Sequence, residues 1–458
     1  MWEVVNNFGN KIWKRPITQN VSQLKPFEKN DDFLTKLGIS WIPNCAKGFF
    51  LNSKQIKVLH DPTSFYNLIL EKIQNANNRI VLASLYLVLL DCIRGSRGEL
   101  NSRKILLPLL ENHASSCQIS LYQTPTLREP FLSIIPERYK EIIGLQHIKA
   151  YLFDNDLIIS GANLSKDYFT NRQDRYILIK ECKELADFVD GLVEKVSECS
   201  FQLNSENELH LHPTWKYHPS RSEKEQFLQE ARSRLNNYYQ SFSINKTEGC
   251  DTVIFPLVEM NHFNIHMDSS ITTKIMEACS SGMVAYLTTG YFNLPDLYTE
   301  SIIKASQANF DVLMAHPTAN GFFNAKGLAK GVPFAYTELA SQFLNKIISS
   351  KQEYRIKMYE YVRPGWTYHA KGLWLSTVEN DLPFLTMIGS PNFGERSVKR
   401  DLECQFLIAT DNKDLQRELW REKELLFGNC IDRQMIRETT LTTDWCMTGE
   451  PIPEFVTF

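Results

Sequence analysis

Residues 146–176, QHIKAYLFDNDLIISGANLSKDYFTNRQDRY, decide the fold of this chain. From His147 the side chains alternate in character with a period of two residues, which predicts a β-strand. On a strand His147 and Lys149 project from the same face, so an imidazole and an ammonium point into one space. A second short apolar strand leads into a Ser-Gly-Ala-Asn run that ends at Asn163, and Asp174 follows eleven residues later.

The same order of residues returns near the other end of the chain. His369-x-Lys371 is followed by a Gly-Ser-Pro-Asn run that ends at Asn392, and Glu403 lies eleven residues after it. A single His-x-Lys pair carries little information, because most histidines are structural or exposed. Two copies with matched spacing form an internal repeat and indicate that both pairs are catalytic.

The two elements resemble the HxK(x)4D…GSxN motifs of the phospholipase D superfamily, whose two halves share one active site. Further stretches resemble the eukaryotic phosphatidylglycerophosphate synthases within that superfamily: RGSRG at 94–98, YLTTGYFNLP at 286–295, NGFFNAKG at 320–327 and IGSPNFGERSVKRDLE at 388–403. The resemblance spans about Gly48 to Glu424. The second copy departs from the pattern, because Ser376 stands where Asp is expected, whereas the first copy has Asp154.

This resemblance implies the fold class and the activity. The fold would be α/β, with two pseudo-symmetric halves, each a mixed sheet flanked by helices, and the active site at their interface. The activity would be transfer of the phosphatidyl group from CDP-diacylglycerol to glycerol 3-phosphate, without a cofactor. The family further implies a mitochondrial enzyme that is peripheral on the inner membrane, although the N-terminus is not a clear presequence.

At 458 residues the chain is longer than a single core usually grows, so two fused halves are expected. We expect the lead-in to cover the first half. The expected divisions are a lead-in at 1–47, a first half at 48–201, a helical linker at 202–248, a second half at 249–430 and a tail at 431–458.

Local patterns place the main elements. Asp61-Pro62 is a good helix start. The continuous apolar run Ile80 to Leu90 predicts one buried strand. A strand at Met283 to Thr288 and the loop after it echo the run at Ile80, which supports duplication.

Composition restricts the partners. A net charge of −3 without basic stripes argues against nucleic acid. The ten cysteines show no metal-ligand spacing, so we expect neither a structural metal nor a catalytic one. The longest apolar run is too short for a membrane span, and a lipid-using enzyme would therefore work from the membrane surface.

The resemblance also assigns roles at the site. Phosphoryl transfer needs a nucleophile, positive charge near the phosphoryl oxygens and a proton for the leaving group. His147 would attack phosphorus and His369 would serve as acid and base, while the two acids orient the rings. Asp154 is open to a second interpretation, that it caps a turn. The candidate catalytic residues are His147, Lys149, Asp154, Asn163, Asp174, His369, Lys371, Asn392 and Glu403.

Basic residues next to such a site are candidates for contacts with substrate phosphates. The glycine-hinged RGSRG loop has a competing interpretation as a solvated turn, and the loop around Lys326 as one that packs on its own half. The apolar run Pro130 to Pro136 is either core or a segment that dips into lipid. The candidate substrate-binding residues are Arg94, Arg97, Arg103, Lys326 and Ser390.

Three other functions remain open from the sequence. A phosphatidylserine synthase of the same superfamily would differ only in acceptor, and basic residues near the site favour a phosphate-bearing acceptor over serine. A hydrolase, either phospholipase or nuclease, would use water. A membrane-binding scaffold without activity is disfavoured because both histidines, both lysines and both acids are present. The sequence does not predict the oligomeric state.

Overall fold

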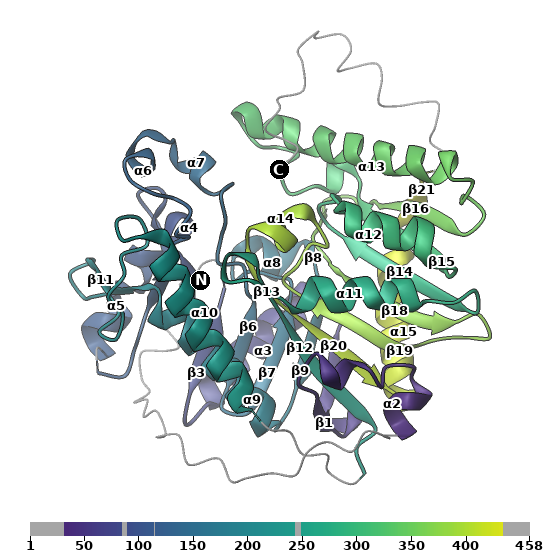
Figure 1. Ribbon diagram of the computed structural model, residues 1–458, viewed down its shortest axis with the longest axis horizontal. Coiled ribbons are helices and arrows are strands. Elements are labelled where there is room, and N and C mark those ends of the chain that lie inside the picture. The colour runs from purple at the N-terminus through teal and green to yellow at the C-terminus, as the bar shows by residue number, and fades with distance from the viewer. Residues whose placement is uncertain (1–31, 85–88, 114, 243–248, 434–458) are drawn as a thin grey trace.

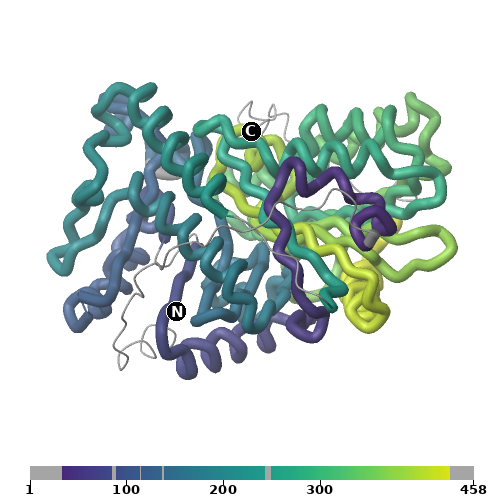
Figure 2. Tube along the Cα trace, turned by 60° about the horizontal axis from the view of Figure 1, so that its bottom comes forward, coloured from purple at the N-terminus to yellow at the C-terminus, as the bar shows by residue number. Residues whose placement is uncertain are grey.

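Two β-sheets, each flanked by helices, make up the two halves of the molecule (Figure 1). The computed structural model describes residues 32–84, 89–113, 115–242 and 249–433. Figure 2 shows the blue and teal first half beside the green and yellow second half. This architecture confirms the expected α/β fold class.

The first sheet is mixed and has nine strands within the described residues. Its strand order is β11 (Leu209–Leu211), β10 (Phe201–Leu203), β5 (Ser120–Tyr122), β4 (Leu89–Asp91), β3 (Ile80–Ala83), β6 (Ala150–Phe153), β7 (Asp156–Ser160), β9 (Tyr176–Ile179) and β2 (Ile56–Leu59). The principal helices of this half are α3 (Pro62–Asn75), α5 (Ser102–His113), α9 (Lys183–Glu198) and α10 (Lys224–Ser241). As the Asp-Pro pair predicts, Asp61 caps α3 by accepting a hydrogen bond from the amide of Ser64.

The second sheet repeats this plan. Its strand order is β1 (Phe49–Leu51), β12 (Thr252–Met260), β20 (Leu402–Thr410), β19 (Asn380–Gly389), β18 (Gly372–Thr377), β14 (Met283–Thr289), β15 (Asn309–Ala315), β16 (Ile356–Tyr361) and β21 (Cys430–Asp432), with β13 (Ile265–His266) beside β12. Its longer helices are α11 (Met267–Ala278), α13 (Val332–Ser349) and α15 (Lys413–Phe427). Among the shorter elements are α4 (Cys92–Ser96), α6 (Phe131–Ile134), α7 (Glu137–Lys140), α8 (Lys166–Thr170), β8 (Arg172–Gln173), α12 (Asp296–Glu300), β17 (Thr367–Tyr368) and α14 (Glu395–Lys399).

The central strands of the two sheets have the same directions. Strand β3 pairs parallel with β4 and antiparallel with β6. Strand β14 likewise pairs parallel with β15 and antiparallel with β18. The internal repeat read from the sequence is therefore also a repeat of topology, as expected for duplication.

Apolar side chains from both sheets meet in one central core cluster, which α9, α10 and α15 also join. Arg175, at the end of the first motif, crosses into the second half. It is fully buried, pairs with Glu422 at 2.7 Å and stacks on Trp374 at 3.8 Å. Because a buried charge is tolerated only with such partners, this contact fixes the halves in one relative position.

Two sequence-based expectations were wrong. The run from Ile80 to Leu90 is not one strand: its described residues belong to β3 and β4, which lie side by side with Ala83 opposite Leu89. An apolar run reports burial, and it cannot distinguish one long strand from two short buried ones.

The described part of the expected lead-in, residues 32–47, packs on the second half rather than on the first. Helix α2 (Asp32–Lys36) and the residues after it pack into the outer core of the second half, and β1 pairs with β12 (Figure 2). The first sheet also extends to Leu211, beyond the expected boundary at residue 201. Of the described helices, none is long and apolar enough to cross a membrane.

Candidate active site

A cavity of about 380 Å³ lies between the two halves and takes its lining from both. Both histidines and both asparagines of the repeat line it. So do Tyr336 on α13 and Glu141 directly after α7. Its charged side chains, apart from the histidines, are Arg94, Glu141, Asp167, Arg172, Glu395, Arg396 and Asp401.

The backbone crosses between halves at both histidines. The His147 amide donates to the carbonyl of Leu402 at 2.9 Å, and the His369 amide donates to the carbonyl of Gln173 at 2.8 Å. In each case the acceptor immediately precedes the acid of the other half. Strand β6 begins only at Ala150, so the predicted strand is shorter at its start and His147 lies in the segment that pairs across the interface.

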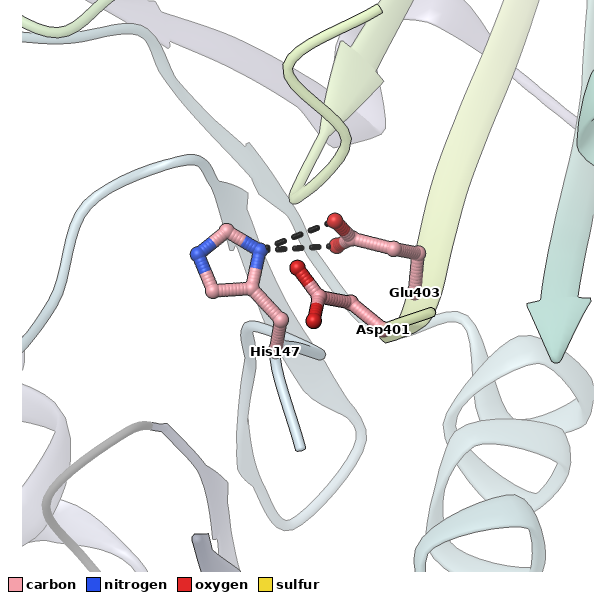
Figure 3. Close-up of side chains that lie close together, drawn as sticks. All are labelled: His147, Asp401 and Glu403. Atoms are coloured by element: carbon pink, nitrogen blue, oxygen red, sulfur yellow. Dashed lines mark hydrogen bonds and ion pairs between the residues drawn. The ribbon is translucent and has the colours of Figure 1, made fainter. Parts of the chain in front are cut away.

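Each histidine is consequently held by the acid of the opposite half. Nδ1 of His147 lies 2.9 Å from the nearer carboxylate oxygen of Glu403, and Nδ1 of His369 lies 2.7 Å from Asp174. Figure 3 shows Nδ1 of His147 turned to Glu403 and the other ring nitrogen pointing away. Engagement of Nδ1 leaves Nε2 of His147 for a substrate, whereas Nε2 of His369 lies 3.1 Å from Nζ of Lys371.

Burial dominates the electrostatics of these pairs. It lowers the pKa of His147 despite the nearby Glu403, so that the ring is neutral at pH 7. Burial, then Lys371 and then Arg172, lower the pKa of His369 well below its usual value. Burial raises the pKa of Asp174 to about 6. Burial alone would also raise the pKa of Glu403. However, the attraction to His147 and the hydrogen bond with it outweigh burial, so the pKa of Glu403 is lowered.

The two lysines are buried behind the histidines. Lys149 and Lys371 each donate to the carbonyl of the histidine two residues earlier, both at 2.8 Å. Burial lowers the pKa of Lys149 to about 7 and that of Lys371 to about 8. Gly161 makes room for Lys371, because a Cβ there would lie 2.6 Å from its Cδ. Neither lysine belongs to the cavity lining.

The asparagines have hydrogen-bonding capacity left for a ligand. Within the described residues, Oδ1 of Asn163 and Oδ1 of Asn392 are buried without a hydrogen-bond partner, although such buried atoms are usually paired. The amide oxygen can accept a hydrogen bond from a ligand hydroxyl. A phosphate oxygen can only accept, so it would bind the amide nitrogen, and this requires the side-chain amide to be turned over.

Two aromatic rings contact His369. The rings of Tyr168 and Tyr291 meet its imidazole edge-on, with centroids 5.0 and 5.4 Å away.

Known proteins with related sequences share one name. The mitochondrial CDP-diacylglycerol–glycerol-3-phosphate 3-phosphatidyltransferase of Homo sapiens is 39% identical over 84% of this chain and 80% of its own length. The Saccharomyces cerevisiae enzyme of that name is 32% identical over 86% of each chain. This chain belongs to the CDP-diacylglycerol–glycerol-3-phosphate 3-phosphatidyltransferase family. No protein-family model matches it.

A solved structure agrees with the fold. The phosphatidylserine synthase of Haemophilus influenzae superposes with a TM-score of 0.68, at 18% identity, over 91% of this chain and 94% of that one. At this identity the likeness shows the shared architecture alone. This member of the phosphatidyltransferase family thus has the two-half fold that the repeat predicted.

Most of the predicted substrate-binding residues of this phosphatidyltransferase lie outside the cavity lining. Arg94 lines the cavity but pairs with Glu141, as does Arg97, which does not line it. Arg103 donates to Asn207, away from the cavity. Lys326 is exposed outside the lining. These basic residues were predicted from closeness in sequence, which does not show which carboxylate or carbonyl partner each one meets.

Two further predictions need correction. Ser390 is fully buried and bonds to the backbone of Cys404, so it supports the strand that carries Glu403 and does not reach the cavity. Asp154 is not at the site either. Its carboxylate accepts from the amides of Asn77, Asn78 and Arg79, and it adopts a left-handed conformation with φ of 54°. Asp154 is a turn-capping residue, which was the alternative interpretation of the sequence.

The sequence reading missed Arg172, Arg396 and Asp401, which line the cavity. An alignment of the two motif copies would have found them. Counted from the motif asparagines, Arg172 and Asp401 occupy the same position, two residues before the acids. Charged residues at equivalent positions beside a catalytic acid are a signal that each motif viewed alone does not give.

One side-chain cluster has the composition of a metal site. The ligand atoms of His147, Asp401 and Glu403 all lie within 4.8 Å of one another (Figure 3). However, Asp401 accepts from Arg396 and from the amide of Leu145, and Glu403 accepts from His147 and from a serine hydroxyl. These donors occupy the carboxylate oxygens, and the guanidinium of Arg396 already supplies positive charge there. The cluster is therefore better suited to orienting His147 than to binding a cation.

Proposed function

We infer that this chain transfers the phosphatidyl group of CDP-diacylglycerol to glycerol 3-phosphate, which yields phosphatidylglycerophosphate and CMP through a phosphohistidine on His147. The observation that carries this inference is the crossed pair of histidines at one cavity, each oriented by the acid of the other half. Family membership supplies the substrates, and the arrangement supplies a nucleophile and a separate acid–base.

The first step forms the intermediate. Nε2 of His147 attacks the phosphorus that carries diacylglycerol, the bond from this phosphorus to the CMP oxygen breaks, and His369 gives that oxygen a proton. The pyrophosphate brings negative charge into the cavity and raises the pKa of His369 from its lowered value, so that the ring is protonated. Lys149 and Lys371 stabilise the charge on the phosphoryl oxygens from behind the rings.

The second step resolves the intermediate. Neutral His369 takes the proton of the primary hydroxyl of glycerol 3-phosphate, and the hydroxyl oxygen attacks the same phosphorus. The P–N bond to His147 breaks, and the neutral ring is restored. Glu403 holds His147 in the tautomer that keeps Nε2 unprotonated for the next cycle.

The enzyme would bind the surface of the mitochondrial inner membrane without spanning it. Helix α6 presents Phe131 and Ile134 to solvent with exposed fractions of 64% and 72%. The chain continues from α6 through α7 to Glu141 at the cavity, and Figure 1 shows α6 and α7 at the upper left and α13 at the upper right of the molecule. Insertion of these side chains into a lipid surface would bring the cavity to its lipid substrate.

The function is tested with purified protein and CDP-diacylglycerol in detergent micelles, with glycerol 3-phosphate, serine or water as the only acceptor. We expect phosphatidylglycerophosphate and CMP only with glycerol 3-phosphate. Exchange of labelled CMP into CDP-diacylglycerol should occur without an acceptor, because the intermediate forms reversibly. A serine product, or CMP release to water alone, would place the chain with the phosphatidylserine synthases or the hydrolases of the superfamily.

The membrane contact has its own test. A variant with Phe131→Ser and Ile134→Ser should lose binding to anionic vesicles and activity on long-chain substrate embedded in them. Its loss on a short-chain, water-soluble CDP-diacylglycerol should be much smaller. An equal loss on both substrates would contradict a role of α6 in lipid contact.

A further inference from the structure

The two halves carry the same ion pair with opposite polarity. In the first half Asp167 pairs with Arg172 at 3.3 Å, and in the second half Arg396 pairs with Asp401 at 3.1 Å. Each pair is five residues apart, and its first member lies four residues after the motif asparagine. The pairs occupy equivalent places in the repeat, with acid and base exchanged.

Because of this exchange, a different member of the pair acts on each histidine: Arg172 on His369 and Asp401 on His147. Arg172 lowers the pKa of His369, whereas Asp401 raises that of His147, although burial is the larger effect on both rings. Arg172 is therefore beside His369, the histidine that activates the acceptor. Asp401 is beside His147, the histidine that carries the phosphatidyl group.

Arg172 is also the cavity arginine that is held least tightly by protein carboxylates. Its acid partner, Asp167, has a side chain that is 61% exposed, and exposed ion pairs contribute little. By contrast, Arg94 pairs with Glu141, whose side chain is 11% exposed, and Arg396 with Asp401, at 5%.

The surroundings of Arg172 fix the position of its guanidinium. Nε donates to the hydroxyl of Thr367 at 3.0 Å, and the ring of Tyr168 packs against the guanidinium at 4.8 Å. A Cβ at Gly321 would lie 3.2 Å from the terminal nitrogen, so a glycine lets this cavity-lining loop approach closely. A guanidinium that is held through Nε and belongs to a residue of the cavity lining suits a phosphate.

We propose that Arg172 binds the phosphate group of the acceptor beside His369, and that the polarity of the two ion pairs makes the enzyme select glycerol 3-phosphate over uncharged glycerol or serine. This proposal rests on the proposed function. The acceptor phosphate replaces the exposed Asp167 on the terminal nitrogens of Arg172.

The test compares kcat/KM for glycerol 3-phosphate and for glycerol, with the same CDP-diacylglycerol. In a mechanism with a covalent intermediate, kcat/KM for the acceptor reports only the second step. Arg172→Gln should lower this value for glycerol 3-phosphate about 100-fold and that for glycerol by less than about threefold, because only the first acceptor loses a charge-assisted contact. Inorganic phosphate should compete with glycerol 3-phosphate in the wild type and at least about tenfold more weakly in Arg172→Gln.

The matched control is Arg396→Gln, which removes the equivalent arginine of the other half. It should affect both acceptors equally, because Arg396 is held by Asp401 and by the carbonyl of Glu141. Arg172→Lys keeps the charge without the planar guanidinium and should restore part of the selectivity. If Arg172→Gln does not fold, Arg172→Lys alone gives the test, with an expected loss of about tenfold in kcat/KM for glycerol 3-phosphate relative to glycerol.

Two other results have distinct meanings. Equal losses for glycerol and glycerol 3-phosphate in the Arg172 variants would overturn the phosphate assignment. A wild-type protein that makes no phosphatidylglycerophosphate, yet exchanges CMP, would refute the proposed function instead.

Discussion

The two halves of this phosphatidyltransferase share a topology and a histidine geometry but differ in charge beside the histidines. His147 and His369 bond to acids of opposite halves at 2.9 and 2.7 Å, and their backbone amides make equivalent crossed bonds. Next to them the repeat places Asp401 in one case and Arg172 in the other. Duplication thus supplied the geometry, and a few charge exchanges made the two sides unequal.

The crossed pairing also explains why neither half could work alone. Each half provides a histidine without its acid and an acid without its histidine, and the buried contact of Arg175 with Glu422 keeps the halves in register. A double site of this kind can divide its labour between a nucleophile and an acid–base.

The largest expected effect comes from His147→Ala, which separates the two histidines. It should lower transfer by about 10⁴-fold or more, because the covalent route is lost. When the wild type is quenched during turnover of CDP-diacylglycerol labelled at the phosphatidyl phosphorus, the label should be found on a peptide containing His147. Label recovered on His369 would reverse the roles of the halves.

The second prediction tests the crossed acids. Glu403→Gln should slow formation of the labelled intermediate by about 10²–10⁴-fold, because the amide no longer favours the tautomer of His147 with an unprotonated Nε2. The measurement is a rapid-quench time course. Ser397→Ala, which removes one donor to Glu403 at 2.7 Å and the acceptor of the Asn392 amide at 3.0 Å, serves as the milder control. A larger loss from Ser397→Ala than from Glu403→Gln would contradict this role of the acid.

The third prediction concerns pH. Burial lowers the pKa of Lys149 to about 7 and of Lys371 to about 8, so the free enzyme loses both charges as pH rises through this window. The value of kcat/KM for CDP-diacylglycerol, which reports the free enzyme, should therefore fall about tenfold per pH unit above it for each required charge. Lys149→Arg keeps its charge and should move the falling limb of the profile to higher pH, at a lower maximum. An unchanged limb in this variant would show that the ammonium of Lys149 is not the titrating group.

The repeat allowed the fold and the central chemistry to be predicted. Which partner each charged side chain meets could not be predicted. His147 and Glu403 are 256 residues apart, and matched spacing marked both without saying which acid orients which histidine. Arg94 and Arg97 looked available in the sequence, but Glu141, 47 and 44 residues further along the chain, pairs with both. The positions of charges in a motif can be read from a sequence, whereas their neutralisation by distant residues depends on the completed fold.

The smallest expected effect comes from Asp154→Asn, and it tests why one half has this acid and the other has Ser376. Asp154 binds three backbone amides at 2.6 to 3.0 Å, whereas the Ser376 hydroxyl donates to the carbonyl of Asp381. Asn tolerates the left-handed backbone but lacks the charge, so we expect about 1 kcal/mol of lost stability, with kcat changed by less than about twofold. Burial opposes but does not cancel the effect of these amides, which lower the pKa of Asp154. The stabilisation is therefore complete above the unfolded value of about 4 and disappears as pH falls below it. Thermal unfolding of both proteins at pH 7 and near pH 3 measures this difference, and a fall in kcat at unchanged stability would return Asp154 to the chemistry.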